Sequence, residues 1–255
     1  MGLLDKLFSK TSKTEQDIEN KKVKQTIFDE ETEFNYSDFE DLKANNNYDR
    51  FFAGNLKLTS GQVVSTDPMF RELGLPQSWT VTPGEYPVYL YIGLDNGYEG
   101  FSGRIAYAEL NLKDEIPTFW ELSLIPENLL ADDFEKKMNG MFPVENGLGS
   151  FSDFETWKLY NQEIVDFNTK NKKGNFYNDV LESHFKANAK IPVSSRGEDW
   201  INYTPQNASA NIIMFGSGWG DGLYTRYVGL DKNRQPVKLI VDFIQLTDEE
   251  DDEEE

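Results

Sequence analysis

The stretch NIIMFGSGWGDGLYTRYVGL, residues 211–230, places a loop with four glycines between two runs that are rich in β-branched and aromatic residues. Such runs are typical of β-strands, and Asp221-Gly222 is a favoured pair in tight turns. The sequence therefore predicts a hairpin whose connection is GSGWGDG (216–222). A third run of the same kind, VKLIVDFIQL (237–246), follows DKNRQP and completes a predicted C-terminal β-meander.

The run at 237–246 is apolar on both faces of the predicted strand. One face carries Val237, Leu239, Val241 and Phe243, and the other carries Ile240, Ile244 and Leu246 together with Asp242. Strands that are covered on both sides show this pattern. We therefore expect this strand to lie in the centre of a sheet, and we expect helices from the middle of the chain to cover it.

Strand signals also dominate the first half of the chain. They fall in the runs LKLTSGQVVSTDP (56–68), YPVYLYIGL (86–94), GRIAYAELNL (103–112) and PTFWELSLI (117–125). The first run predicts two short strands or one hairpin around Ser60-Gly61. Asn96-Gly97 is a strong turn signal between the second and third runs.

The middle of the chain has the apolar spacing of helices. The helical runs are PENLLADDFEKKMNG (126–140), SDFETWKLYNQEIVDFN (152–168) and NFYNDVLESHFKANAK (175–190). Ser152 and Glu155 form a capping box at the start of the second run. The predicted fold class is α+β, mainly an antiparallel β-sheet with a helical middle segment and a C-terminal β-meander.

The chain is predicted to hold one globular domain at residues 51–246. Residues 1–50 are polar and charge-mixed and predict a flexible leader with one short helix, capped by Ser37 and Glu40. Residues 247–255 predict a disordered acidic tail.

The formal net charge is −20, of which the eight acids of Asp248–Glu255 account for −8, so the rest carries −12. Nucleic-acid binding is not expected, because phosphate contacts need clustered Lys and Arg. An acidic protein of this kind suits a basic protein partner. There is no cysteine, which excludes a thiol nucleophile and thiolate zinc, and no apolar run is long enough for a transmembrane segment. We expect a cytoplasmic protein without a cofactor.

GSGWGDG does not match the glycine-rich loops that bind phosphate or calcium. A dinucleotide loop leads from a strand into a helix, whereas LYTRYVGL (223–230) alternates as a strand. An EF-hand needs several acids, and Asp221 stands alone. A structural hairpin is the favoured interpretation. The alternative is a functional loop in which an exposed Trp219 anchors a contact.

Three other residues are candidates for an ion pair or for catalysis. If Asp242 is buried, it must be paired, protonated or bound to a cation, and Arg226 on the neighbouring predicted strand is its expected partner. His184 is the single histidine, and no G-x-S-x-G motif accompanies it, so catalysis by His184 is not expected.

These residues lie within motifs that resemble a known family. The ordered series is LTSGQVVSTDP, TPGEYPVYL, FPVENGLGSFSD, SGWGDGLYTRYVGLD and LIVDF. It resembles, over about residues 55–246, the bacterial family catalogued as domain of unknown function 4241. Glu145 stands where an aspartate is expected in the central motif. The resemblance implies a shared fold without an established activity, and it transfers no catalytic residues.

The resemblance also draws attention to five carboxylates, namely Asp67, Glu145, Asp153, Asp221 and Asp242. Carboxylates in such motifs bind metals, perform acid–base chemistry, or hold tight turns by accepting backbone N–H groups. Glycines flank most of them, so the holding of turns is the favoured explanation. If a metal is bound, Asp67, Glu145, Asp221 and Asp242 are its predicted ligands.

The sequence thus predicts a non-enzymatic protein-binding module, such as an immunity or antitoxin-like protein directed against a basic partner. Its predicted binding residues are Trp219, Asp221, Asp242 and Arg226. The alternative is a carboxylate-metal-dependent hydrolase, in which a hard cation activates water.

Overall fold

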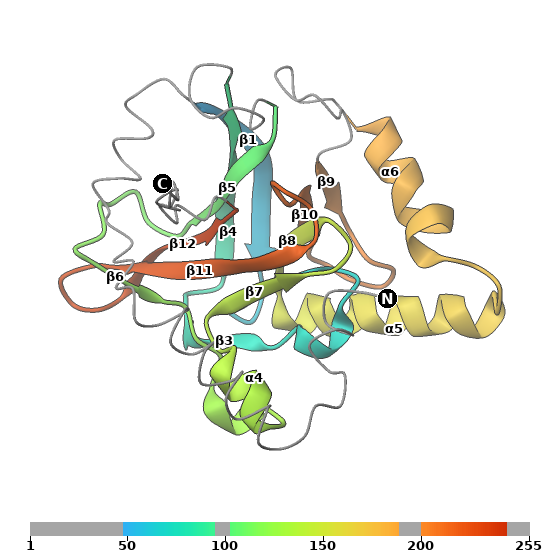
Figure 1. The fold of residues 1–255 in the computed structure, drawn as a ribbon, viewed down its shortest axis with the longest axis horizontal. Coiled ribbons are helices and arrows are strands. Elements are labelled where there is room, and N and C mark those ends of the chain that lie inside the picture. Colours follow the sequence, from blue (N-terminus) through green and yellow to red (C-terminus); the bar gives the residue numbers. More distant parts are fainter. Residues whose placement is uncertain (1–47, 95–102, 189–199, 244–255) are drawn as a thin grey trace, which may run out of the picture.

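Two antiparallel β-sheets lie face to face in the computed structural model, and helices cover the outer face of one of them (Figure 1). The structure describes residues 48–94, 103–188 and 200–243. The predicted cap at Ser37, the turn at Asn96-Gly97 and the acidic tail lie outside these residues.

The larger sheet has seven strands. Its order is β1 (Tyr48–Leu58), β4 (Gly84–Gly93), β5 (Ile105–Asn111), β12 (Pro236–Asp242), β11 (Gly222–Leu230) and β6 (Phe119–Leu122), with β7 (Met141–Val144) also paired to β11. Strands β6 and β7 share one edge of β11, because β6 pairs with residues 227–230 and β7 with residues 222–225.

The smaller sheet has five strands. Its order is β3 (Pro76–Thr80), β2 (Gln62–Thr66), β8 (Leu148–Asp153), β10 (Ile212–Gly216) and β9 (Trp200–Tyr203). The alternation of the strands turns one face of each sheet towards the other.

Aromatic and aliphatic side chains fill the space between the sheets. Phe243 lies at the centre of an aromatic group, with ring centroids 5.0 Å from Tyr224, 5.9 Å from Phe142 and 6.1 Å from Phe215. Phe142, Phe215 and Phe243 are fully buried. Burial of one such side chain contributes about 1.5–3 kcal/mol, so this core is a main source of stability.

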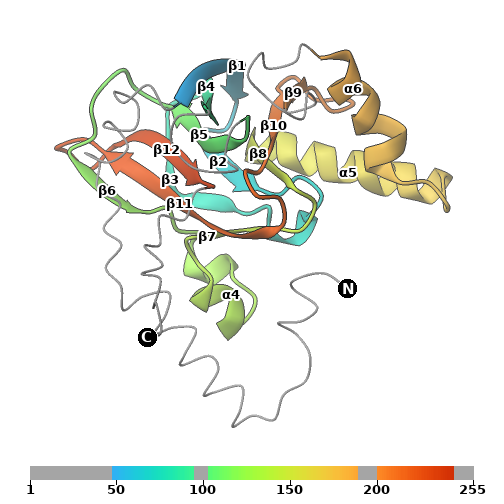
Figure 2. The same cartoon turned by 45° about the horizontal axis from the view of Figure 1, so that its top comes forward.

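The helices lie on the outer face of the five-stranded sheet (Figure 2). Helix α5 (Phe154–Lys170) buries Trp157, Tyr160 and Ile164. After a turn come η3 (Tyr177–Leu181) and α6 (Glu182–Ala187), in which Leu181 and Phe185 are buried. The remaining short helices are η1 (Arg71–Leu73), η2 (Glu127–Leu129) and α4 (Asp133–Lys137). None of the described helices is long and apolar enough to cross a bilayer.

The predicted class, α+β and mainly antiparallel β, is confirmed. The central position of β12 is also confirmed, since it lies between β5 and β11. The prediction that helices from the middle of the chain cover β12 was wrong. Helices α5 and α6 lie on the other sheet, and β12 places Leu239 and Val241 in the core between the sheets and Ile240 against aromatic side chains on the opposite face.

The hairpin predicted at 211–230 is in fact a crossing between sheets. Strand β10 pairs with β8 and β9, not with β11, so the loop at 217–221 leads from the smaller sheet to the larger one. The three C-terminal strands therefore form no single meander. Around Ser60-Gly61, two separate strands are present rather than one hairpin, because the turn at 59–61 leads from β1 in one sheet to β2 in the other.

The start of α5 also differs by one residue from the predicted capping box. Ser152 is the penultimate residue of β8, and the N-cap is Asp153, whose side chain accepts a hydrogen bond from the Glu155 N–H. An aspartate meets this requirement as well as a serine does.

Candidate functional site

Aspartate side chains hold the turns that connect the two sheets. Asp153 is fully buried, and its two oxygens accept hydrogen bonds from Thr59 Oγ1 (2.9 Å), Ser60 N (2.8 Å) and Ser60 Oγ (2.7 Å). Because the same carboxylate caps α5, it ties the turn at 59–61 to the start of the helix.

Asp67 holds the turn between β7 and β8. Its Oδ2 atom accepts hydrogen bonds from Glu145 N (2.9 Å) and from Asn146 N (3.0 Å) and Nδ2 (3.2 Å), while Oδ1 accepts one from Met69 N (2.8 Å). Burial raises the pKa of the Asp67 carboxyl, although these hydrogen bonds act in the opposite direction.

Asp221 connects the same turn to the glycine-rich loop. Its Oδ1 atom accepts a hydrogen bond from Gly147 N at 2.9 Å, and Ser217 N donates to Gly147 O at 2.9 Å. Within the loop, Ser217 Oγ and Tyr224 Oη both donate to Gly220 O, at 2.8 and 2.9 Å. The backbone on both sides of Trp219 is therefore held by several hydrogen bonds.

The Trp219 side chain itself points outward and is 51% exposed. The Arg104 guanidinium lies over its ring, 4.7 Å from the centroid, and Arg104 Nη1 donates to Gly218 O at 2.9 Å. We name this surface, made of Arg104, residues 145–147 and residues 217–221, the Trp219 corner. It presents an amphipathic aromatic ring on a loop that is already ordered.

The structure brings some of the predicted site residues together and separates others. Trp219, Asp221 and the Glu145 backbone all lie in the Trp219 corner, and Asp67 accepts hydrogen bonds from the backbone of its turn at Glu145 and Asn146. Asp153 lies at the other end of β8 from Gly147. The favoured interpretation, that these aspartates hold turns, is confirmed for Asp67, Asp153 and Asp221.

The expected ion pair between Arg226 and Asp242 was wrong. In the register of β11 and β12, Arg226 lies opposite Val241 and Asp242 lies opposite Thr225, so the two side chains are on different faces of the sheet. Arg226 is buried between the sheets and donates to backbone carbonyls. On the outer face, burial and then the Asp242 carboxylate raise the pKa of Tyr227 to about 12.

Among the described residues, no three Asp, Glu or His side chains are grouped so as to hold a metal ion. His184 is exposed on α6, where its ring meets the Tyr203 ring edge to face with centroids 5.1 Å apart.

Sequence reasoning missed a buried ionic cluster on the outer face of the seven-stranded sheet. The fully buried Glu109 carboxylate accepts hydrogen bonds from Tyr91 Oη (2.6 Å) and Lys238 Nζ (3.0 Å), and Arg50 Nη2 lies 3.7 Å away. Burial, followed by the Glu109 charge, raises the pKa of Tyr91. Glu109 lies on an alternating strand, and its polar position between apolar neighbours was the available signal.

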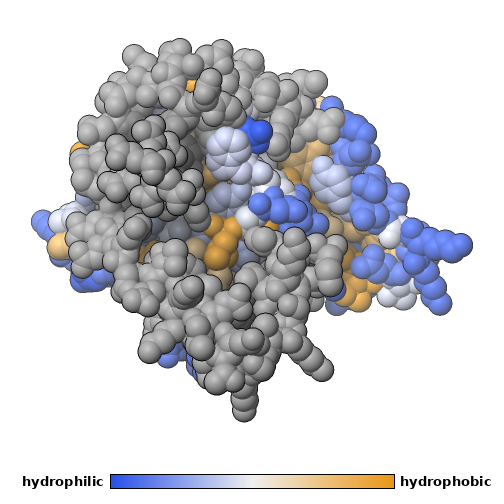
Figure 3. Space-filling view, in the orientation of Figure 1, coloured by the Kyte–Doolittle hydropathy of each residue, from blue (hydrophilic) through white to orange (hydrophobic). Residues whose placement is uncertain are grey.

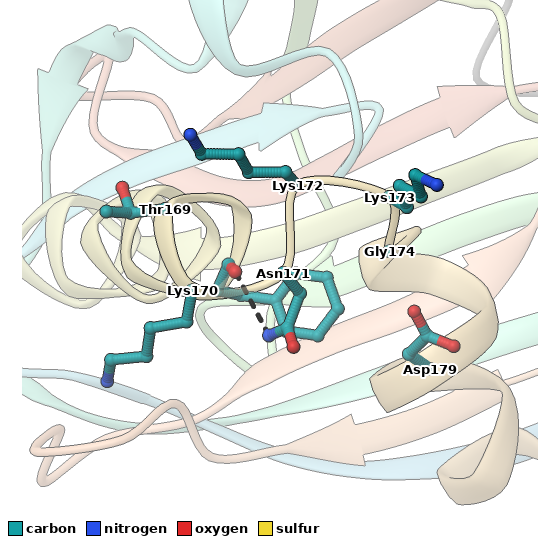
Figure 4. Close-up of a pocket in the computed structure, with 8 residues that line it drawn as sticks. Thr169, Lys170, Asn171, Lys172, Lys173, Gly174 and Asp179 are labelled. Carbon is teal, nitrogen blue, oxygen red and sulfur yellow. Dashed lines mark hydrogen bonds between the residues drawn. The ribbon is translucent and has the colours of Figure 1, made fainter.

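A surface hollow at the end of α5 lacks the converging side chains of a ligand-binding site. Residues 169–174 line it together with Phe167 and Asp179. Figure 4 shows the side chains of Lys170, Lys172 and Lys173 pointing away from one another, so they do not converge on a ligand. In Figure 3, the surface of α5 and α6 at the right is largely hydrophilic.

We expect Gly220→Ala to lower the free energy of unfolding by about 1–2 kcal/mol, because Gly220 has φ = +93°, which a side chain disfavours. A Cβ atom at Gly220 would touch nothing within 4 Å, so the effect comes from the backbone alone. Gly84→Ala is the matched control, since Gly84 is not among the glycines of positive φ and a Cβ atom there would make only ordinary contacts, at 3.5 Å, with Tyr86. Urea denaturation of both variants measures the difference, and equal losses would contradict this explanation.

A family model described as "Protein of unknown function (DUF4241)" matches residues 56–241 of the chain. No curated protein and no solved structure matches the chain.

Proposed function

The chain belongs to the DUF4241 family of proteins of unknown function, and we propose that it is a non-enzymatic binding module that captures a basic protein through the Trp219 corner. The observation that carries this proposal is the half-exposed Trp219 ring on a loop whose backbone is held on both sides. An immunity or antitoxin-like role in a bacterial cytoplasm is the finer form of the proposal.

The geometry of the corner supports recognition of a protein. Trp and Arg are the residue types that most often dominate binding energy at protein interfaces. Trp219 and Arg104 are stacked on each other before any partner arrives. An anchor that is ordered in advance loses little conformational entropy on binding, so more of its contact energy appears as affinity.

The charge of the chain supports a basic partner. The net charge of −20 would accelerate the approach of a basic protein, at a rate that falls with added salt. At the corner, Asp221 is exposed, and within the described part of the chain only its Oδ1 atom accepts a hydrogen bond, from Gly147 N. The second oxygen is therefore placed to accept a Lys or Arg of the partner.

We expect Trp219→Ala to weaken capture of the partner by at least about tenfold without lowering the melting temperature, because the exposed ring contributes little to the core. The experiment is a tagged pull-down from native lysate at low and at moderate salt, followed by a binding titration with the protein that is enriched. Phe52→Ala is the matched control, since Phe52 is also 51% exposed but lies on β1.

If no protein is enriched at either salt concentration, the binding-module proposal fails. If a protein is enriched equally by the wild type and by both variants, the module binds through another surface and the role of the Trp219 corner is wrong.

The carboxylate-metal hydrolase stays a prediction. The carboxylates of Asp67 and Asp221 accept hydrogen bonds from backbone N–H groups, and no contact among the described residues favours a metal-activated water.

A further inference from the structure

Arg226 is buried at the point where the edge of the seven-stranded sheet divides. Its backbone N–H donates to Gly140 O, ahead of β7, and its carbonyl accepts from Ser123 N, after β6. The side chain is 3% exposed and extends towards the five-stranded sheet, where Nη1 donates to Ser65 O at 2.9 Å. Arg226 therefore bridges the two sheets.

The guanidinium has no acidic partner among the described residues. Its other hydrogen bond runs from Nε to Ser123 O at 2.9 Å, so both of its acceptors are neutral carbonyls. A buried charge without a counter-charge is costly. Consistent with this cost, burial lowers the pKa of Arg226 to about 10.

The neighbouring side chains add donors and no charge. Trp79 Nε1 donates to Ser123 Oγ at 3.0 Å, and Ser123 Oγ donates to Gln77 Oε1 at 2.7 Å. The Gln77 amide therefore turns its oxygen towards Ser123. This order leaves the Gln77 Nε2 amide as a donor.

Several of these donors are unused. Among the residues that the structure describes, Gln77 Nε2 and Ser65 Oγ are buried without a hydrogen-bond partner, and Arg226 uses two of its five N–H groups. All three residues belong to one connected network between the sheets, because Arg226 bonds the Ser65 carbonyl and shares Ser123 with Gln77. The network has surplus donors and a positive charge.

We propose that Arg226, Gln77 and Ser65 form an internal binding site for a small monovalent anion of the chloride type. An anion accepts hydrogen bonds from several N–H and O–H groups at once. It also supplies the negative charge that the two carbonyls lack and that a water molecule cannot provide. The ligand has to be small, because Arg226 and Gln77 are each 3% exposed and Ser65 is fully buried. Such an ion would join β2, β3 and β11, and so hold the two sheets together.

The test compares thermal unfolding of the full chain in sodium chloride and in sodium gluconate at the same ionic strength. The sodium concentration is then constant, so cation effects on the many carboxylates cancel. We expect the melting temperature to rise as chloride replaces gluconate and to level off. At about a hundred times the dissociation constant, the expected rise is about 5–10 °C. Sodium bromide should act in the same way, and bromide should give an anomalous peak beside the Arg226 guanidinium in a crystal.

The decisive variant is Gln77→Glu, which adds a negative charge to the network that Gln77 and Arg226 share through Ser123, where the anion would bind. We expect this variant to be more stable than the wild type in gluconate and to show no rise with chloride. Gln206→Glu is the control, because it makes the same charge change at an exposed position and should keep the full rise.

Equal melting temperatures of the wild type in chloride and gluconate would overturn the proposal and indicate that water serves the donors. A chloride effect that persists in Gln77→Glu would overturn it too, since chloride would then act elsewhere. If Gln77→Glu does not fold, Ser65→Ala takes its place. It removes one donor and should raise the chloride concentration at half-maximal effect at least about threefold, and an unchanged midpoint would reject the site.

Discussion

Replacing Asp153 with alanine is expected to lower the free energy of unfolding by about 3–5 kcal/mol. The substitution removes the N-cap of α5 and leaves Ser60 N and Glu155 N without their acceptor. Each buried donor that loses its partner costs about 1–3 kcal/mol. The loss should appear in urea denaturation as a lower midpoint with an unchanged slope.

Asp166→Ala is the control for this measurement. Asp166 is exposed on the same helix and accepts one hydrogen bond, from Gln162. Its loss should cost less than about 0.5 kcal/mol, as is usual for surface positions. If Asp153→Ala were no more destabilising than Asp166→Ala, the connection between the turn and the helix would contribute little, contrary to our account.

Replacing Asp67 with alanine is expected to have a similar effect, about 3–5 kcal/mol. Asp67 is fully buried, and the change deprives the backbone N–H groups of Met69, Glu145 and Asn146 of their acceptor. The turn at 145–147 also supports the loop of Trp219 through Gly147. The variant should therefore lose affinity for a partner as well as stability, since the anchor is no longer held in place.

Asp221→Asn provides the comparison. An asparagine keeps one side-chain oxygen for the single hydrogen bond from Gly147 N, so the expected loss is below about 1 kcal/mol. Chemical denaturation and partner titration of both variants separate the two aspartates. A loss of stability in Asp221→Asn as large as that in Asp67→Ala would show that the exposed carboxylate has a larger structural role than its one hydrogen bond explains.

The candidate site could be predicted only in part. Trp219 and Asp221 were recognisable because a tryptophan and an acid within a glycine-rich loop are unusual, and turn chemistry correctly suggested that aspartates accept backbone N–H groups. Arg104 was missed. It lies 114 residues before Gly218, whose carbonyl it binds, and no local pattern distinguishes it from the other basic residues.

The partner of Arg226 shows how strongly such predictions depend on register. Arg226 and Asp242 do lie on neighbouring strands, as predicted. The pairing of Arg226 with Val241 differs from the assumed pairing by one residue, and a shift of one residue moves a side chain to the opposite face of the sheet. The expected ion pair is therefore absent, and among the described residues the Arg226 guanidinium donates to two backbone carbonyls instead.

The sequence by itself determined where helix α5 and about half of the strands lie, because these follow from the periods of two and 3.6 residues. It did not predict β3, β7, β8 or β9, or the start of β1 at Tyr48. It also determined that aspartates and glycines occupy the turns. Only the tertiary structure decided which sheet each strand joins. A turn signal such as Ser60-Gly61 or Asp221-Gly222 indicates that the chain changes direction. The same residues occur whether the next strand pairs with the previous strand or crosses to the opposite sheet. That choice depends on the burial of whole apolar faces between the sheets, to which residues from β1 to β12 contribute together.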